Sequence, residues 1–290
     1  MQRRSFLTLA AAVPLLAAAQ PSDELALPVE LRGGRFFALP RLTDGSTFAC
    51  WLDTDGSGFV FAHAVRRLTL PTRSDGMRSL THLPHFDPTL AVPPLVRNDG
   101  ELPVFDPKDG DAADPILQGF DAQLGGSWFA DRVWRLDFAR PAMSLRLTPL
   151  PAALANVPVT FDRVYPQTRV TIAGETLTMS VDIAASVAIE PSGGYAVSAT
   201  SFVRRSVFDR WITDHPAWKV ERNVSTQPGI DRIVVPELHA GNVAFTSVGF
   251  TTRPDDDVFE GGNLAGKLGA NAYAGRIVTI DYPNARLRIE

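Results

Sequence analysis

Two stretches of the sequence, one in each half, follow the same pattern. Residues 43–57 read T-D-G-S-T-F-A-C-W-L-D-T-D-G-S, and residues 172–186 read I-A-G-E-T-L-T-M-S-V-D-I-A-A-S. Each stretch has a glycine, then a run of apolar and small residues typical of a strand, then an aspartate at the same distance from the glycine. The pattern indicates an internal duplication in which Asp53 and Asp182 occupy equivalent places.

Two further blocks recur in the same order along the chain. V-P-P-L at residues 92–95 matches V-P-E-L at residues 235–238. L-G-G-S-W-F-A-D-R-V-W-R-L-D-F at residues 124–138 matches L-G-A-N-A-Y-A-G-R-I-V-T-I-D-Y at residues 268–282. Because three blocks keep their order, we predict that the two halves share one β fold and that each ends in an alternating strand.

The second half contains additional residues between Asp182 and Val235, because the spacing between matching blocks grows there. Between Ser201 and His215, apolar residues recur at helical spacing. We therefore predict a short inserted helix, capped by Ser201 and ended by Pro216. The first half is expected to have a short helix over residues 62–68. The apolar residues of the inserted helix are Phe202, Val203, Val207, Trp211 and Ile212.

The composition favours a mostly β globular protein. The 290 residues include 23 prolines and 22 glycines, a density of turn formers that suits short strands. Hydrophobic residues make up 45% and charged residues 21%, which excludes a chain disordered throughout. The net charge is −4 and the basic residues are scattered, which argues against nucleic acid as a partner.

These patterns predict two β halves that face each other across a cleft. We place the halves at residues 35–150 and 151–290, with residues 20–34 as an N-terminal linker. The Pro- and Ala-rich stretch T-P-L-P-A-A-L-A-N-V-P at residues 148–158 joins the halves. The expected assembly is a monomer of two such halves.

Residues 1–19 resemble a twin-arginine export signal. The segment carries Q-R-R-S-F-L-T, an apolar run and a closing A-A-A that suits signal cleavage. The run is too short for a membrane span, so we expect a periplasmic or secreted protein without a stable membrane span. Cys50 is the single cysteine of the chain and is expected to be a small buried residue.

The quoted motifs resemble those of aspartic peptidases. L-D-T-D-G-S-G-F-V-F at residues 52–61 resembles the Asp-Thr-Gly loop of that class, and residues 268–289 resemble the closing segment of retropepsin-like bacterial aspartyl proteases. The resemblance implies two acid-protease-like β-barrel lobes fused as in pepsin. It implies an exported endopeptidase that hydrolyses extended peptides and needs no cofactor.

The same resemblance assigns roles to individual residues. Asp53 and Asp182 would be the catalytic pair, and Gly125 and Gly269 would let the L-G strands pass beneath the two aspartate loops. Thr54 would bond across the two loops. The supporting loop residues are Thr54, Asp55, Gly56, Ser57, Ile183, Ala184 and Ser186.

Such chemistry needs two close carboxylates that share one proton, one acting as base and the other as acid. The chain departs from the pattern because Asp55 replaces a glycine, and Ile183 and Ala184 replace a threonine and a glycine. The alternative is a non-catalytic acid-protease-like envelope protein that binds peptides or a partner in the same cleft. If Asp55 hinders ionisation of the pair, Asp55→Gly with Ile183→Thr and Ala184→Gly should raise the rate.

Two metal-site interpretations compete for nearby residues, although we expect no metal. Asp53, Asp55 and Ser57 satisfy the opening of a calcium-binding EF-hand loop, but Ala64 stands where that loop needs a bidentate glutamate. The stretch H-L-P-H-F-D at residues 82–87 offers two imidazoles and a carboxylate, without a third firm ligand.

Overall fold

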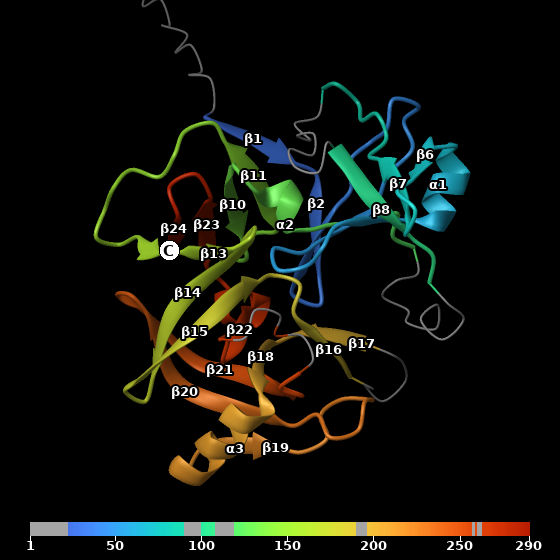
Figure 1. Cartoon of the computed structure of the whole chain (residues 1–290). Helices are drawn as coiled ribbons and strands as arrows, with labels where there is room; N and C mark the ends of the chain where they lie inside the picture. The colour runs from blue at the N-terminus through green and yellow to red at the C-terminus, as the bar shows by residue number, and fades with distance from the viewer. Residues whose placement is uncertain (1–22, 90–99, 108–118, 190–195, 257–258, 260–262) are drawn as a thin grey trace, which may run out of the picture.

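The structure is a computed structural model that describes residues 23–89, 100–107, 119–189, 196–256, 259 and 263–290. The chain is mostly β, with three large sheets, a two-stranded ribbon and few short helices in these residues (Figure 1). The expected export signal at residues 1–19 and the V-P-P-L block at residues 92–95 lie outside the described residues.

An eight-stranded sheet forms in the first half of the chain. Its central strands are buried on both faces: Phe36 packs in the main core, while Phe37 packs with Phe61 and Phe120 in a second cluster. The helix α1 (Ala62–Leu68) has the bounds predicted from the sequence. In spatial order the strands are β2 (Val29–Arg32), β3 (Arg35–Ala38), β4 (Cys50–Leu52), β9 (Ala122–Leu124), β5 (Phe59–Phe61), β8 (Glu101–Phe105), β7 (Ser79–His82) and β6 (Thr72–Ser74).

A second eight-stranded sheet forms in the second half. Buried and more exposed residues alternate along β14, as expected for a strand with one face on the core. In spatial order the strands are β13 (Thr160–Asp162), β14 (Tyr165–Ile172), β15 (Glu175–Asp182), β22 (Gly266–Gly269), β18 (Ser201–Arg204), β21 (Val243–Arg253), β20 (Arg232–Ala240) and β19 (Lys219–Glu221).

A six-stranded sheet joins the two halves. At its centre β10 and β23 run antiparallel, with Arg135 opposite Thr279, so the two strands of the third repeated block pair with each other. Each strand is preceded by a short helical turn, α2 (Gly126–Phe129) or η2 (Ala270–Tyr273). The order is β1 (Glu24–Leu27), β11 (Ala142–Arg146), β10 (Val133–Asp137), β23 (Ile277–Asp281), β24 (Arg286–Ile289) and β12 (Val157–Pro158).

Residues 20–34, which we expected to be a linker, contain strands from Glu24 onward. β1 pairs antiparallel with β11 at the edge of the six-stranded sheet, and β2 pairs with β3 in the first eight-stranded sheet. Tertiary pairing therefore orders a segment whose local sequence gave no strong strand signal.

The helix expected from Ser201 begins later, at the end of a strand. Residues 201–204 form β18, which pairs with β21 and β22, so their backbone groups bond within the sheet. The Ser201 hydroxyl donates to Asn271 Oδ1 and accepts from the Gly269 amide, and it caps no helix. The helix is α3 (Arg205–Asp214).

The inserted element of the second half is a hairpin. Both α1 and α3 directly follow the strand that runs antiparallel to the L-G strand, β5 in the first half and β18 in the second. The additional residues before β18 belong to the ribbon of β16 (Ser186–Ile189) and β17 (Ala196–Ala199). A helix is therefore present within the predicted residues, but it is not the inserted element, because α3 corresponds to α1.

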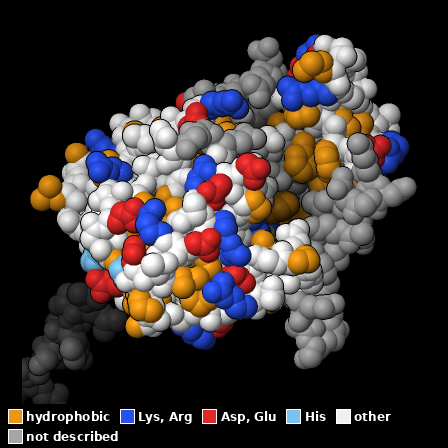
Figure 2. Space-filling view, turned by 60° about the horizontal axis from the view of Figure 1, so that its bottom comes forward, with side chains coloured by type: hydrophobic (Ala, Val, Ile, Leu, Met, Phe, Trp, Pro, Cys, Tyr) orange, Lys and Arg blue, Asp and Glu red, His pale blue; other side chains and the backbone are white. Residues whose placement is uncertain are grey.

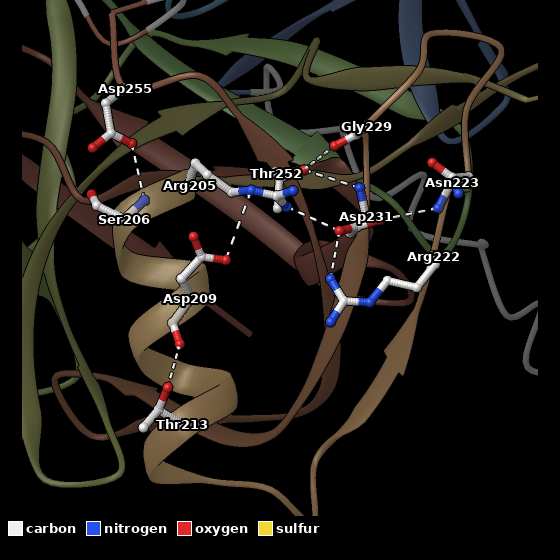
Figure 3. Close-up of polar contacts among 10 residues, drawn as sticks. All are labelled: Arg205, Ser206, Asp209, Thr213, Arg222, Asn223, Gly229, Asp231, Thr252 and Asp255. Carbon is white, nitrogen blue, oxygen red and sulfur yellow. Dashed lines mark hydrogen bonds and ion pairs between the residues drawn. The ribbon is translucent and has the colours of Figure 1, made fainter.

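An ionic cluster fixes the start of α3 (Figure 3). The buried Asp231 carboxylate accepts from Arg205 at 2.9 Å and Arg222 at 2.7 Å, and from the Asn223 amide at 3.0 Å. Asp255 accepts from the Ser206 amide, one of the first amides of the helix, which has no intrahelical partner. Residues far apart in the sequence thus hold α3 against the second sheet.

The core contains the single cysteine, and charges of both signs are spread over the surface, as expected from the composition. Cys50 is buried in the main core, as predicted. Figure 2 shows acidic and basic side chains interspersed on the face that carries α3. Within the described residues, the helices are too short and too polar to cross a membrane.

Candidate functional site

Asp53 and Asp182 lie at matching places in the two eight-stranded sheets. Asp53 directly follows β4, which runs parallel to β9, and its amide donates to Leu124 O at 3.0 Å. Asp182 ends β15, which runs parallel to β22, and it lies opposite Gly269. In each half, the strand that leads to the aspartate pairs parallel with the L-G strand, and the L-G strand pairs antiparallel with a third strand, β5 or β18. The arrangement of these three strands is therefore the same around both aspartates.

Both carboxylates are also fixed within their own loops. Asp53 Oδ1 accepts from the Asp55 amide at 2.9 Å, and Asp182 Oδ1 accepts from the Ala184 amide at 3.0 Å. A bond to the amide two residues later leaves the second oxygen of each carboxylate for other partners.

The two L-G pairs pass close to these loops. A Cβ on Gly125 would lie 2.3 Å from Gly56 O, and one on Gly269 would lie 1.7 Å from Thr200 O. A Cβ on Gly56 would lie 2.1 Å from Asp53 Oδ2. Each of these positions therefore requires glycine, because backbone or the aspartate itself occupies the space of a side chain.

Thr54 connects the two aspartate loops. Its hydroxyl is fully buried, donates to Val181 O at 2.5 Å and accepts from the Ile183 amide at 3.2 Å. These two backbone groups flank Asp182. Because Ile183 has no hydroxyl, the second loop cannot return the same contact.

Two polar residues that the sequence analysis did not select reach the aspartates. Gln123 Nε2 donates to Asp53 Oδ2 at 3.0 Å and to Ser57 O at 2.9 Å. Lys267 Nζ lies 2.7 Å from Asp55 Oδ2 and 3.5 Å from Asp182 Oδ2. The signal was present in A-Q-L-G and G-K-L-G, where a polar residue directly precedes each L-G pair in an otherwise buried strand.

Burial and mutual repulsion raise the pKa values of the first-half carboxyls. Burial, and next the Asp182 charge, raise the pKa of Asp53 to about 8. The same two causes raise the pKa of Asp55 to about 6, although Lys267 opposes the shift. Burial would lower the pKa of Lys267, but Asp182 and Asp55 raise it overall, so its ammonium stays charged.

A cavity of about 690 Å³ lies over these groups and is lined by both halves of the chain. Asp53, Asp55, Asp182 and Lys267 reach it, and so do Ser57, Ala184 and Ser186. Its walls include the aromatic residues Trp51, Tyr165 and Phe202. The cavity offers a proton donor and an acceptor beside apolar surface.

One side of the cavity is joined across the two halves. Arg35 Nη1 donates to Ser186 Oγ at 3.2 Å, and the Ala199 amide donates to Gly33 O at 2.8 Å. The β16–β17 ribbon therefore packs against the β2–β3 turn beside the aspartates.

The competing metal interpretations find no support in the site. In the described part of the chain, no group of three or more His, Cys, Asp or Glu side chains is arranged to hold a metal ion. Asp55, a ligand in the calcium interpretation, binds Lys267 instead. His82 Nδ1 lies 3.1 Å from Gly100 O, a backbone contact.

Comparisons with known proteins extend the description of the fold. No protein-family model matches the sequence, and no curated protein sequence matches it. Among solved structures, conglutin gamma, described as a unique basic 7S globulin from lupine seeds, is similar with a TM-score of 0.51 and 10% identity, over 92% of this chain and 94% of that chain. The basic 7S globulin from soybean covers 93% of this chain and 95% of its own, with 12% identity and a TM-score of 0.47. The lupine likeness concerns the fold alone.

Proposed function

We propose that the two halves are two acid-protease-like lobes that face each other across the cavity. Three features support this arrangement: the matching parallel strand pairs at Asp53 and Asp182, the two L-G pairs, and the central β10–β23 pairing of the shared sheet. The proposed working unit is one chain, because both lobes are present in it.

We further propose that the protein is an exported aspartic endopeptidase. One observation carries this proposal: two equivalent carboxylates, on loops connected by Thr54, line one cavity shared by both halves. Export itself rests on the sequence signal at residues 1–19.

The proposed chemistry uses water as the nucleophile. Asp182 takes a proton from water as its oxygen attacks the peptide carbonyl carbon, while protonated Asp53 donates its proton to the carbonyl oxygen. The tetrahedral intermediate, a gem-diol, then collapses: the C–N bond breaks, and the leaving nitrogen receives the proton held by Asp182. The ionised Asp53 takes back a proton from one hydroxyl of the diol, which becomes the carbonyl of the new carboxylic acid, and both aspartates return to their starting protonation states. Asp53 suits the acid role because its pKa of about 8 keeps it protonated at neutral pH.

Extended peptides are the proposed substrate class. A strand-like peptide can bond through its backbone while its side chains enter pockets. Trp51, Tyr165 and Phe202 offer such apolar walls near the carboxylates.

A non-catalytic peptide-binding role is the second candidate. It is favoured by Ile183 and Ala184 in place of a threonine and a glycine, and by the Lys267 ammonium 3.5 Å from Asp182. The fold alone, shared with a lupine-seed globulin, does not distinguish the two candidates, so the choice depends on the site.

Peptide cleavage followed by mass spectrometry tests the proposal. We expect the wild-type protein to cut a pool of unstructured peptides between about pH 4 and 7, and Asp53→Asn and Asp182→Asn each to abolish cutting. Asp106→Asn is the matched control, because Asp106 is exposed and does not line the cavity. Peptides that stay intact at every pH while still binding the protein would favour the second candidate.

A further inference from the structure

We propose that Asp55, Ser180 and Lys267 form a buried bridge between the two halves that replaces the missing threonine contact and positions Asp182. We call these three residues the Asp55 bridge. Its activity test rests on the proposed peptidase function, while its stability test does not.

The bridge begins in the first half and ends on two strands of the second. Asp55 Oδ2 accepts from Ser180 Oγ of β15 at 2.8 Å and from Lys267 Nζ of β22 at 2.7 Å. β15 and β22 are the strands that hold Asp182. Asp55 therefore reaches the framework of the opposite aspartate.

This contact complements the one made by Thr54. Thr54 bonds to Val181 and Ile183, on either side of Asp182, but Ile183 cannot bond back. A symmetric pair of threonines would connect the loops twice. Here Thr54 and Asp55, neighbours in the first loop, make both connections.

Lys267 also holds Asp182 directly. Its Nζ lies 3.5 Å from Asp182 Oδ2, and only 9% of the Lys267 side chain, 6% of Asp55 and 7% of Asp182 is exposed. Because these side chains are so little exposed, removing one member of the ion pair leaves a buried charge without compensation. The ammonium therefore fixes the position of Asp182 and offsets the charge of the third carboxylate.

The other groups that face the bridge are few. Asp53 lies on the same loop as Asp55. Burial, and next the aspartate charges, raise the pKa values of the Tyr273 and Tyr282 phenols. Arg163 and Tyr165 line the cavity nearby. The only ammonium that contacts Asp55 or Asp182 among the described residues is that of Lys267.

The bridge reverses an expectation drawn from the sequence. Asp55→Gly was expected to raise the rate by removing a hindering charge. With the bridge in place, Asp55→Gly leaves Ser180 without its acceptor and Lys267 with Asp182 alone, so we expect a lower rate, even with Ile183→Thr and Ala184→Gly added.

The activity test compares Lys267→Met, Lys267→Arg, Asp55→Asn and the double variant Lys267→Met/Asp55→Asn. With a pool of unstructured peptides as substrate, we expect Lys267→Met to lower kcat/KM about 10²-fold near pH 5, the loss typical of a misplaced catalytic group. Its acid limb should move to higher pH, because two carboxylates then lack a cation. Lys267→Arg should keep the wild-type acid limb, and the double variant should return toward it.

A purely structural lysine would behave differently. An equal loss at every pH in Lys267→Met, or a double variant whose loss is the sum of the single losses, would overturn the bridge. Asp106→Asn serves as the exposed-carboxylate control and should leave the profile unchanged.

Thermal unfolding tests the bridge even if no peptide is cut. Lys267→Met should unfold at a lower temperature than wild type at pH 7. The gap should narrow toward pH 4, because Asp55, whose pKa is raised to about 6, becomes protonated, and the double variant should recover part of it. A constant gap across pH, or additive effects in the double variant, would overturn the bridge. If the wild-type protein cuts no peptide but the unfolding temperatures depend on pH as predicted, the peptidase proposal is wrong and the proposal of the Asp55 bridge stands.

Discussion

Among single residues, Thr54 connects the two aspartate loops through two hydrogen bonds of one hydroxyl. Its hydroxyl satisfies a buried carbonyl and a buried amide of the opposite half. Thr54→Val keeps the shape but leaves both groups unpaired, so we expect a loss of about 1–3 kcal/mol in the free energy of unfolding and a lower peptide-cleavage rate.

Chemical denaturation and cleavage assays on the same preparation measure these effects. Thr213→Val is the matched control, because Thr213 bonds only to Asp209 O on the exposed side of α3. A Thr54→Val variant as stable as this control would show that the contact does not hold the loops together.

The raised pKa of Asp53 also predicts how stability depends on pH. The folded state keeps the Asp53 proton to about pH 8, whereas the unfolded chain releases it near 3.8, so the folded state binds more protons between these values. The free energy of unfolding should therefore fall as pH rises from about 4 to 8.

Asp53→Asn removes this dependence. It should flatten the fall and stabilise the protein at pH 8 by an amount on the order of a few kcal/mol, because one pKa unit corresponds to about 1.4 kcal/mol. Denaturation midpoints at pH 4, 6 and 8 measure the effect. Parallel curves for the variant and wild type would contradict it.

Among the helices, the bounds of α1 were predicted correctly from the sequence, whereas α3 begins at Arg205 and not at Ser201 as predicted. The apolar residues at 202 and 203 fit helical spacing as well as a buried strand, and periodicity cannot separate these for short runs. Residues 201–204 form a strand because β18 pairs with β21 and β22. This pairing depends on residues distant in the sequence, so local periodicity does not reveal it. The β16–β17 ribbon, which supplies the additional residues of the second half, was not predicted from the sequence.

The ionic cluster at the start of α3 gives a prediction at this scale. Asp231→Ala removes the acceptor of two guanidinium groups and of the Asn223 amide, so we expect a loss of roughly 2 kcal/mol in the free energy of unfolding. Asp209→Ala is the control: its carboxylate is exposed and 3.7 Å from Arg205, a contact worth less than about 0.5 kcal/mol.

Urea denaturation followed by Trp fluorescence measures both variants. Trp211 of α3 is buried against the Phe250 ring, so its fluorescence reports loosening of the helix. Equal losses in Asp231→Ala and Asp209→Ala would show that burial of the Asp231 carboxylate adds nothing.

In the whole molecule, the internal repeat singled out Asp53 and Asp182 from the sequence alone, because each lies eight residues after a glycine in a matching stretch. Gln123 and Lys267 were missed for a physical reason. The direction of a side chain from a strand depends on its register with neighbouring strands, and a single sequence does not reveal which face meets the other half.

The shared six-stranded sheet predicts that the two halves unfold together. β10 and β23 come from different halves and pair at its centre, so unfolding of one half exposes the other. Calorimetry at neutral pH should give one cooperative transition. Two separated transitions would show that the halves are independent.

A ¹³C NMR titration of the aspartate carboxyl carbons tests most directly whether Asp53 and Asp182 act as one coupled pair. We predict that the Asp53 carbon titrates near pH 8 and that Asp182→Asn lowers the pKa of Asp53. Titration of Asp53 near pH 4, unchanged by Asp182→Asn, would show that the two carboxyls are not coupled.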